Sequence, residues 1–142
     1  MEMKNPEHLQ LVSEDDVLGV IGDSPPLLPE NIKQVDALCT EVQTIAYRGT
    51  NDARLVFAFQ VIEPELHSGM KLQMFARHAG WKTLPVRSKL WKLATVATNG
   101  QLRRKQKVTK SLFVGKIFRC RVRQDKNGHY TVIDTLIKKL TG

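Results

Sequence analysis

Residues 118–123 read Phe-Arg-Cys-Arg-Val-Arg and alternate between apolar and basic side chains without interruption. Because successive side chains of a β-strand point to opposite faces, this segment predicts a strand whose apolar residues face a core. Arg119, Arg121 and Arg123 would then form a row on the outer face, about 6 to 7 Å apart. The phosphates of an extended single-stranded nucleic acid have roughly this spacing, so the row is a candidate phosphate-binding surface.

Patterns on both sides of this strand complete a small β-fold. Strands are predicted where apolar residues alternate, and a helix where they recur at helical spacing. The first strand is long and alternates imperfectly, which predicts a bulge, and Asn127-Gly128 predicts a type I′ hairpin turn. In chain order we expect strands at 35–48, 53–62 and 70–77, a helix from Pro85 to the stop at Asn99-Gly100, and strands at 112–124 and 129–136.

Three strands, one helix and two strands, in that order, are the plan of a five-stranded Greek-key barrel of the OB type. The predicted fold class is therefore mainly β, with one helix between strands 3 and 4. We expect this domain to cover residues 34–142. Residues 1–33 contain prolines that disfavour helix, so they are predicted to form an N-terminal arm.

Charge is divided unequally between these two parts. The chain has 142 residues and a formal net charge of +8, but residues 1–33 carry −5, which leaves +13 for the remainder. Residues 82–126 hold fourteen Lys and Arg side chains and a single acid, Asp125. A domain this basic attracts polyanions at long range. The acidic arm is interpreted as a competitor for the basic face, a contact to a neighbouring subunit of a homo-oligomer, or a disordered solubilising tail.

The C-terminal half also carries a family resemblance. A basic helical segment at 87–92 precedes Gly-Lys at 115–116, an alternating strand, and a Tyr-x-x-Ile pattern at 130–133. Over residues 34–137 the chain resembles the small OB-fold single-stranded-DNA-binding and replication-associated proteins of phages and integrative mobile elements. The resemblance implies single-strand binding in DNA replication or recombination rather than catalysis. The acidic N-terminal residues lie outside it.

Single-strand binding requires cations that follow the backbone and flat side chains on which bases stack. The third strand offers both on its outer face, Trp81 follows a glycine in a loop, and the basic connector after the helix is interpreted as a clamp. The predicted nucleic-acid-binding residues are Lys71, Phe75, Arg77, Trp81, Arg103, Arg104, Lys105, Lys107, Arg119, Arg121 and Arg123, with Lys110, Tyr47 and Tyr130 as further candidates.

Each signal has a plainer interpretation. The arginine row is also compatible with a solvated sheet face, although such a face usually mixes charge signs. Phe75 is equally compatible with the core, Trp91 is expected in the core, and the connector is compatible with a solubilising loop. For function, the main alternative is an OB-type protein-interaction module that recruits a replication or recombination partner. A further alternative function is binding of RNA or of duplex nucleic acid.

Other function classes lack their sequence signals. The four histidines are scattered without metal-site spacing, phosphate-binding loops and nucleophile motifs are absent, and Asp134 is expected to pair with an arginine. We therefore expect no enzyme activity, no metal and no cofactor. Cys39 and Cys120 are expected to be half-buried free thiols rather than a disulfide. Without an apolar run of membrane-spanning length or a signal region, the chain is predicted to be cytoplasmic.

Overall fold

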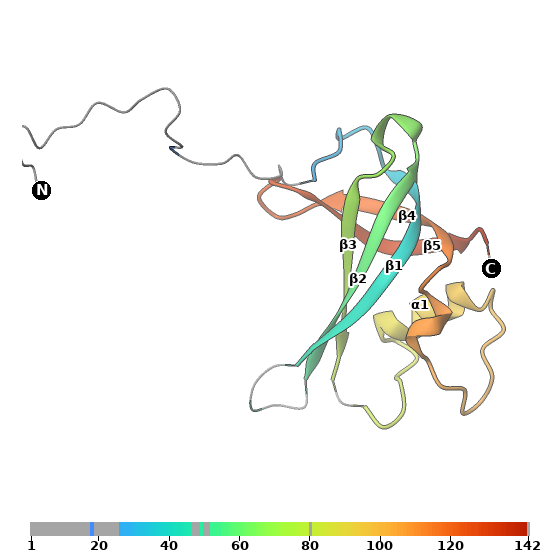
Figure 1. Cartoon of the computed structure of the whole chain (residues 1–142). Helices are drawn as coiled ribbons and strands as arrows, with labels where there is room; N and C mark the ends of the chain where they lie inside the picture. The colour runs from blue at the N-terminus through green and yellow to red at the C-terminus, as the bar shows by residue number, and fades with distance from the viewer. Residues whose placement is uncertain (1–17, 19–25, 47–48, 50–51, 80, 142) are drawn as a thin grey trace, which may run out of the picture.

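The structure is a computed structural model that describes residues 18, 26–46, 49, 52–79 and 81–141. Its strands close into a barrel in the spatial order β1-β2-β3-β5-β4, and the helix α1 (Lys89–Ala97) follows β3 in the chain (Figure 1). The mainly β, five-stranded OB-type barrel with one helix between strands 3 and 4 is thus confirmed. The strands are β1 (Gln34–Ala46), β2 (Ala53–Glu63), β3 (Lys71–His78), β4 (Ile117–Gln124) and β5 (Thr131–Lys139).

The long first strand pairs with two neighbouring strands. Residues 34–38 pair with β4 and residues 36–46 pair with β2, both in antiparallel register. The register shifts between Cys39 and Glu41, which is the predicted bulge, and this irregularity lets one strand turn the corner of a closed barrel. Beyond it, β1 and β2 continue as a hairpin (Figure 1). Residues 50 and 51, in the turn expected between these two strands, lie outside the described residues.

The predicted apolar faces fill the barrel. Phe57 and Phe59 of β2 and Leu72 and Met74 of β3 are at most 1% exposed, and Phe118 is completely buried. The aromatic rings pack on one another, with the centroids of Phe57 and Phe113 5.1 Å apart in an edge-to-face arrangement. Burying one such side chain contributes about 2 kcal/mol. Strand alternation therefore accounts for the core.

Both cysteines are free, as expected, and they are fully buried rather than half-buried. Burial raises the pKa of the Cys39 thiol to about 12, although a smaller contribution from hydrogen bonding with the Glu41 backbone opposes the shift. Burial, followed by the charge of Asp36, also raises the pKa of Cys120. Both side chains are consequently protonated thiols at neutral pH.

The helix begins later than its sequence pattern predicts. Pro85 lies in the preceding turn, and Val86, expected on the apolar helix face, is 65% exposed. Ser88 caps the helix instead, because its hydroxyl accepts the Trp91 N–H at 3.2 Å and satisfies an otherwise unpaired amide. The predicted stop is confirmed: Asn99 and Gly100 take positive φ angles of 56° and 79°.

The β4–β5 hairpin exists, but its turn is not of type I′. Gly128 has a φ of 69°, whereas Asn127 does not have the positive φ that a type I′ turn requires at both positions. Asp125 organises the turn instead, because its carboxylate accepts the His129 and Tyr130 N–H groups at 2.6 and 3.1 Å. Both strands are displaced from prediction. β4 starts at 117 because the 3₁₀ helix η3 (Lys110–Leu112) replaces its expected beginning, and β5 runs from 131 to 139.

Residues 26–33, which we call the strap, pack on the barrel. Leu28 is 2% exposed and belongs to the hydrophobic core. Its N–H donates to the hydroxyl of Thr131 at 2.8 Å, and the Thr131 N–H donates to the carbonyl of Pro26 at 2.7 Å. Thr131 is the one buried polar residue among those that the structure describes. The hydrogen bond from the Leu28 N–H satisfies its hydroxyl. Most of the remaining predicted arm lies outside the described residues.

Candidate nucleic-acid interface

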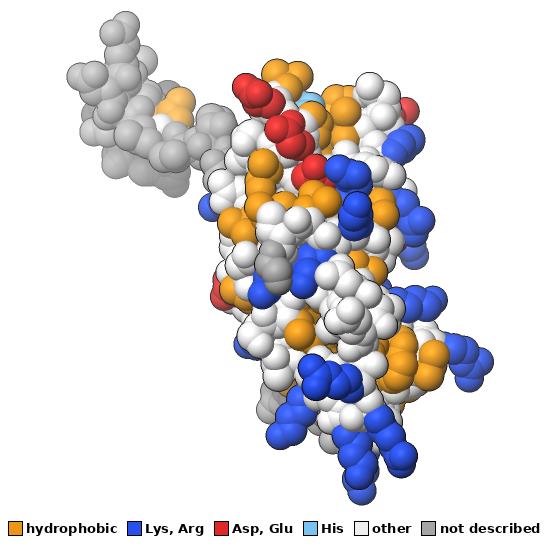
Figure 2. Space-filling view, turned by 90° about the vertical axis from the view of Figure 1, so that its right-hand side faces the viewer, with side chains coloured by type: hydrophobic (Ala, Val, Ile, Leu, Met, Phe, Trp, Pro, Cys, Tyr) orange, Lys and Arg blue, Asp and Glu red, His pale blue; other side chains and the backbone are white. Residues whose placement is uncertain are grey.

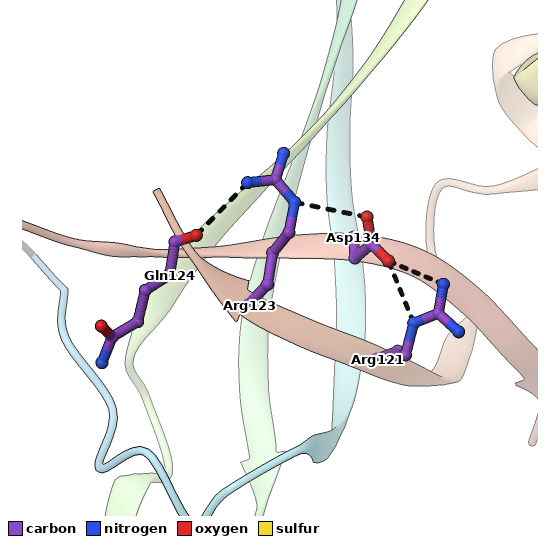
Figure 3. A network of polar contacts seen from close by, with 4 residues as sticks. All are labelled: Arg121, Arg123, Gln124 and Asp134. Atoms are coloured by element: carbon purple, nitrogen blue, oxygen red, sulfur yellow. Dashed lines mark hydrogen bonds and ion pairs between the residues drawn. The ribbon is translucent and has the colours of Figure 1, made fainter. Parts of the chain in front are cut away.

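The arginine row of β4 lies on the outer face, but its side chains are paired. Arg119 forms an ion pair with Asp36 of β1 at 3.0 Å. Arg121 and Arg123 share Asp134 of β5, at 2.7 and 3.3 Å (Figure 3). Charges of both signs therefore meet on this face, as the plainer interpretation of a solvated sheet face has it. The acids come from the two adjacent strands, so the sequence of β4 alone could not reveal them.

Asp134 pairs with arginine as expected, and it pairs with two. Partial burial acts to raise the pKa of Asp134, but the hydrogen bonds and charges of Arg121 and Arg123 outweigh it, with help from Lys89. The resulting pKa is below its ordinary value. A carboxylate with a lowered folded-state pKa stabilises the fold above about pH 4 and loses that contribution as the pH falls further. The Asp134 carboxylate is therefore ionised at neutral pH.

The candidates on β3 share the outer face but have different neighbours. Lys71 is exposed near the start of the strand. The guanidinium of Arg54 lies 3.8 Å from the centroid of the Phe75 ring and occupies one of its stacking faces. Arg77 forms an exposed ion pair with Asp52 at 3.4 Å. This strand thus offers one unobstructed cation and a ring that is already half covered.

A groove of about 1130 Å³ opens between the β1–β2 hairpin and the segment that links α1 to β4. We call that segment, residues 101–109, the connector, and the cavity the hairpin–connector groove. Four parts of the chain line it: the hairpin, the loop after β3, residues of α1 that are buried or partly buried, and the connector with η3. Its apolar lining consists of Val42, Leu55, Phe57, Leu84, Leu90, Ala94, Leu102, Val108 and Phe113.

The rim of this groove is strongly basic. No Asp or Glu of the described chain lines it, and none of its Lys or Arg side chains forms an ion pair with a described carboxylate. Figure 2 shows the side of the molecule that carries α1 and the connector. On the lower part of this side, Lys and Arg gather around apolar side chains. The basic lining residues are Lys82, Arg103, Arg104, Lys105, Lys107 and Lys110.

The connector holds its cations in a compact turn. The Gln106 N–H donates to the Arg103 carbonyl at 3.1 Å, and the Gln106 side-chain carbonyl accepts the Arg103 N–H at 2.9 Å. Lys105 takes a positive φ of 63° within this turn. Leu102 and Val108 are partly buried on either side and anchor the two ends. The basic side chains between the anchors remain exposed.

Two tryptophans line the same groove. Trp81, predicted as a stacking residue, is partly buried, and its ring centroid lies 6.0 Å from that of His78. Trp91 was expected in the core, but it is only partly buried and lines the groove from α1. Tyr130 is exposed on the β4–β5 hairpin and does not line the groove, and Tyr47 lies outside the described residues.

The structure therefore brings together only part of the predicted site. Trp81 and the basic connector residues converge on the groove, whereas the β3 and β4 candidates lie outside its lining. Sequence reasoning missed Lys82, His78 and Trp91. The sequence indicated two of them in part. Lys82 directly follows the predicted stacking residue Trp81, and Trp91 lies beside the apolar stripe of the helix, next to Leu90.

No cluster of three or more His, Cys, Asp or Glu side chains within the described ranges could hold a metal ion. The same ranges contain no helix of the length and apolarity needed to cross a membrane. No protein-family model matches the chain, and no curated protein matches it. The resemblance to phage and mobile-element proteins stays a prediction.

Proposed function

We propose that this chain is a non-enzymatic OB-type protein that binds single-stranded nucleic acid, DNA in the first instance, in the hairpin–connector groove. The observation that carries the proposal is the composition of that groove. Two tryptophans, further apolar side chains and six basic side chains line it together, and no described acid does. The sequence resemblance suggests replication or recombination of DNA as the process.

The groove meets both physical requirements of single-strand binding in one place. Stacking of a base on an aromatic side chain contributes about 1 to 3 kcal/mol and tolerates any base, so little sequence preference is expected. Lysine and arginine contribute by neutralising phosphates and releasing counterions. The β4 face, by contrast, has cations that already pair with acids, and the β3 face has a ring covered by Arg54.

The first test is the salt dependence of binding. The full chain is titrated with oligothymidine, and tryptophan fluorescence reports binding. If the six groove cations each neutralise one phosphate, log affinity falls with log salt at a slope of about −4, or roughly −0.7 per contact. A slope near zero would contradict the proposal. Equal competition by a duplex of the same length would indicate backbone binding without base stacking and would also overturn it.

Trp81 provides the second test. Trp81→Ala is expected to weaken oligothymidine binding about tenfold, since one stacked base is lost, whereas Trp81→Phe retains most of the affinity. Fluorescence anisotropy of a labelled oligonucleotide measures both. Tyr130→Ala is the matched control, because Tyr130 is an exposed aromatic that does not line the groove. Equal affinity of Trp81→Ala and the wild type would exclude Trp81 as a stacking residue.

A further inference from the structure

The three arginines of β4 differ in how many carboxylates neutralise them. Arg119 and Asp36 form a one-to-one pair in which Nε and Nη2 contact the two carboxylate oxygens. Arg121 and Arg123, in contrast, share the single carboxylate of Asp134. The first pair is neutral, whereas the second group retains one positive charge. Only the second group has a charge left for an incoming phosphate.

The geometry of the second group also leaves donors available. Arg121 uses Nε and Nη2 on one oxygen of Asp134. Arg123 uses Nε on the other oxygen and Nη1 on the backbone carbonyl of Gln124 (Figure 3). Within the described chain, Nη1 of Arg121 and Nη2 of Arg123 have no hydrogen-bond partner. Asp134 thus lies between two guanidiniums, each with one terminal nitrogen that has no partner in the described chain, and both side chains are more than half exposed (Figure 3).

Lys89 adds a third cation to this group. It is the first residue of α1, the helix that packs against β5, and its charge contributes to the low pKa of Asp134. Lys89 lies only two residues before Trp91, which lines the hairpin–connector groove. The first turn of α1 therefore carries both Lys89, whose charge acts on Asp134, and Trp91, which lines the groove.

We infer that Arg121, Arg123 and Lys89 form a second phosphate site, which binds the backbone of a single strand where it leaves the hairpin–connector groove around α1. Asp134 is the positioning residue that fixes the two guanidiniums. This inference rests on the proposed function of the groove. It adds that the ligand is a strand longer than the groove can hold, and that affinity increases with length.

The test compares two oligothymidines, of about 5 and about 15 nucleotides, within the range of known OB-fold site sizes. Arg121→Gln is compared with Arg119→Gln, which removes the same charge from the same face of the same strand. We expect Arg121→Gln to weaken binding of the long oligonucleotide about fivefold near 0.1 M salt and to lower the salt slope by about 0.7, as for one phosphate contact. Its affinity for the short oligonucleotide, and both affinities of Arg119→Gln, stay at the wild-type value.

Three results would decide against the inference. It is overturned if the two variants weaken long-oligonucleotide binding by the same factor, or if Arg121→Gln weakens the short and the long ligand equally. In both cases binding in the groove still stands. If the wild type binds neither length, the proposed function itself fails, and the second site fails with it. Thermal unfolding of each variant verifies that the barrel is intact, and Arg123→Gln, which removes the other guanidinium, is expected to behave as Arg121→Gln does.

Discussion

Replacing Arg103, Arg104 and Lys107 together by alanine is expected to weaken binding of single-stranded DNA by about two orders of magnitude near 0.1 M salt. Each lost phosphate contact on a single strand changes the salt slope by about 0.7, which corresponds to about a fivefold loss of affinity at that salt concentration. The slope itself should become shallower by about 2. Fluorescence anisotropy over a series of salt concentrations measures both quantities.

A second triple variant separates the groove from net charge. Lys33, Lys71 and Lys126 are exposed cations that do not line the groove, and replacing them by alanine also removes three positive charges. This control is expected to lose only the small long-range contribution to binding. If both triple variants lose affinity equally, total charge rather than the groove controls binding. The connector residues are exposed, and their side chains form no ion pair within the described chain, so the fold should tolerate their replacement.

Leu28→Ala is expected to lower the free energy of unfolding by about 2 to 5 kcal/mol, the range for a large-to-small substitution in a packed core. Leu28 is 2% exposed although it precedes the first strand of the barrel. Its neighbour Leu27 is 47% exposed, so Leu27→Ala is the matched control and should cost little. Urea denaturation followed by tryptophan fluorescence measures the difference.

Truncation tests the same contact independently. Removing residues 1–25 leaves the strap in place, whereas removing residues 1–31 also deletes Leu28 and the contacts that Pro26 and Leu28 make with Thr131. The shorter truncation should preserve the midpoint of denaturation, and the longer one should lower it. Equal midpoints for the two truncations, or equal effects of Leu27→Ala and Leu28→Ala, would show that the strap does not stabilise the barrel.

Local sequence patterns predicted the parts of this fold that depend on local geometry. The alternating residues of β2, β3 and β4 have the predicted inward and outward faces, because strand alternation follows directly from backbone pleating. The helix start was misplaced because Pro85 and Ser88 are both suitable near a helix N-terminus. The hydrogen bond from the Trp91 N–H to the Ser88 hydroxyl decides between them.

Features that depend on contacts across the barrel could be predicted only in part: an arginine partner for Asp134 was expected, but not which arginines, nor that there are two. Asp36 lies 83 residues before Arg119, and the pairing of Arg121 and Arg123 with Asp134 depends on a register shift between Arg121 and Val122. The groove unites segments from positions 42 to 113, so no single window of sequence indicates it. The connector was identified because many basic residues fall within a short stretch of sequence. That it lines the same groove as Trp91 could be seen only in the folded barrel.

The enclosure of both native thiols has a practical consequence. Because Cys39 and Cys120 lie inside the barrel as protonated thiols, they react slowly with reagents that require an exposed thiolate. A single cysteine introduced on the connector would therefore be the reactive one, without prior removal of the natural pair. A dye or photo-crosslinker attached there would record which part of a ligand passes over that loop.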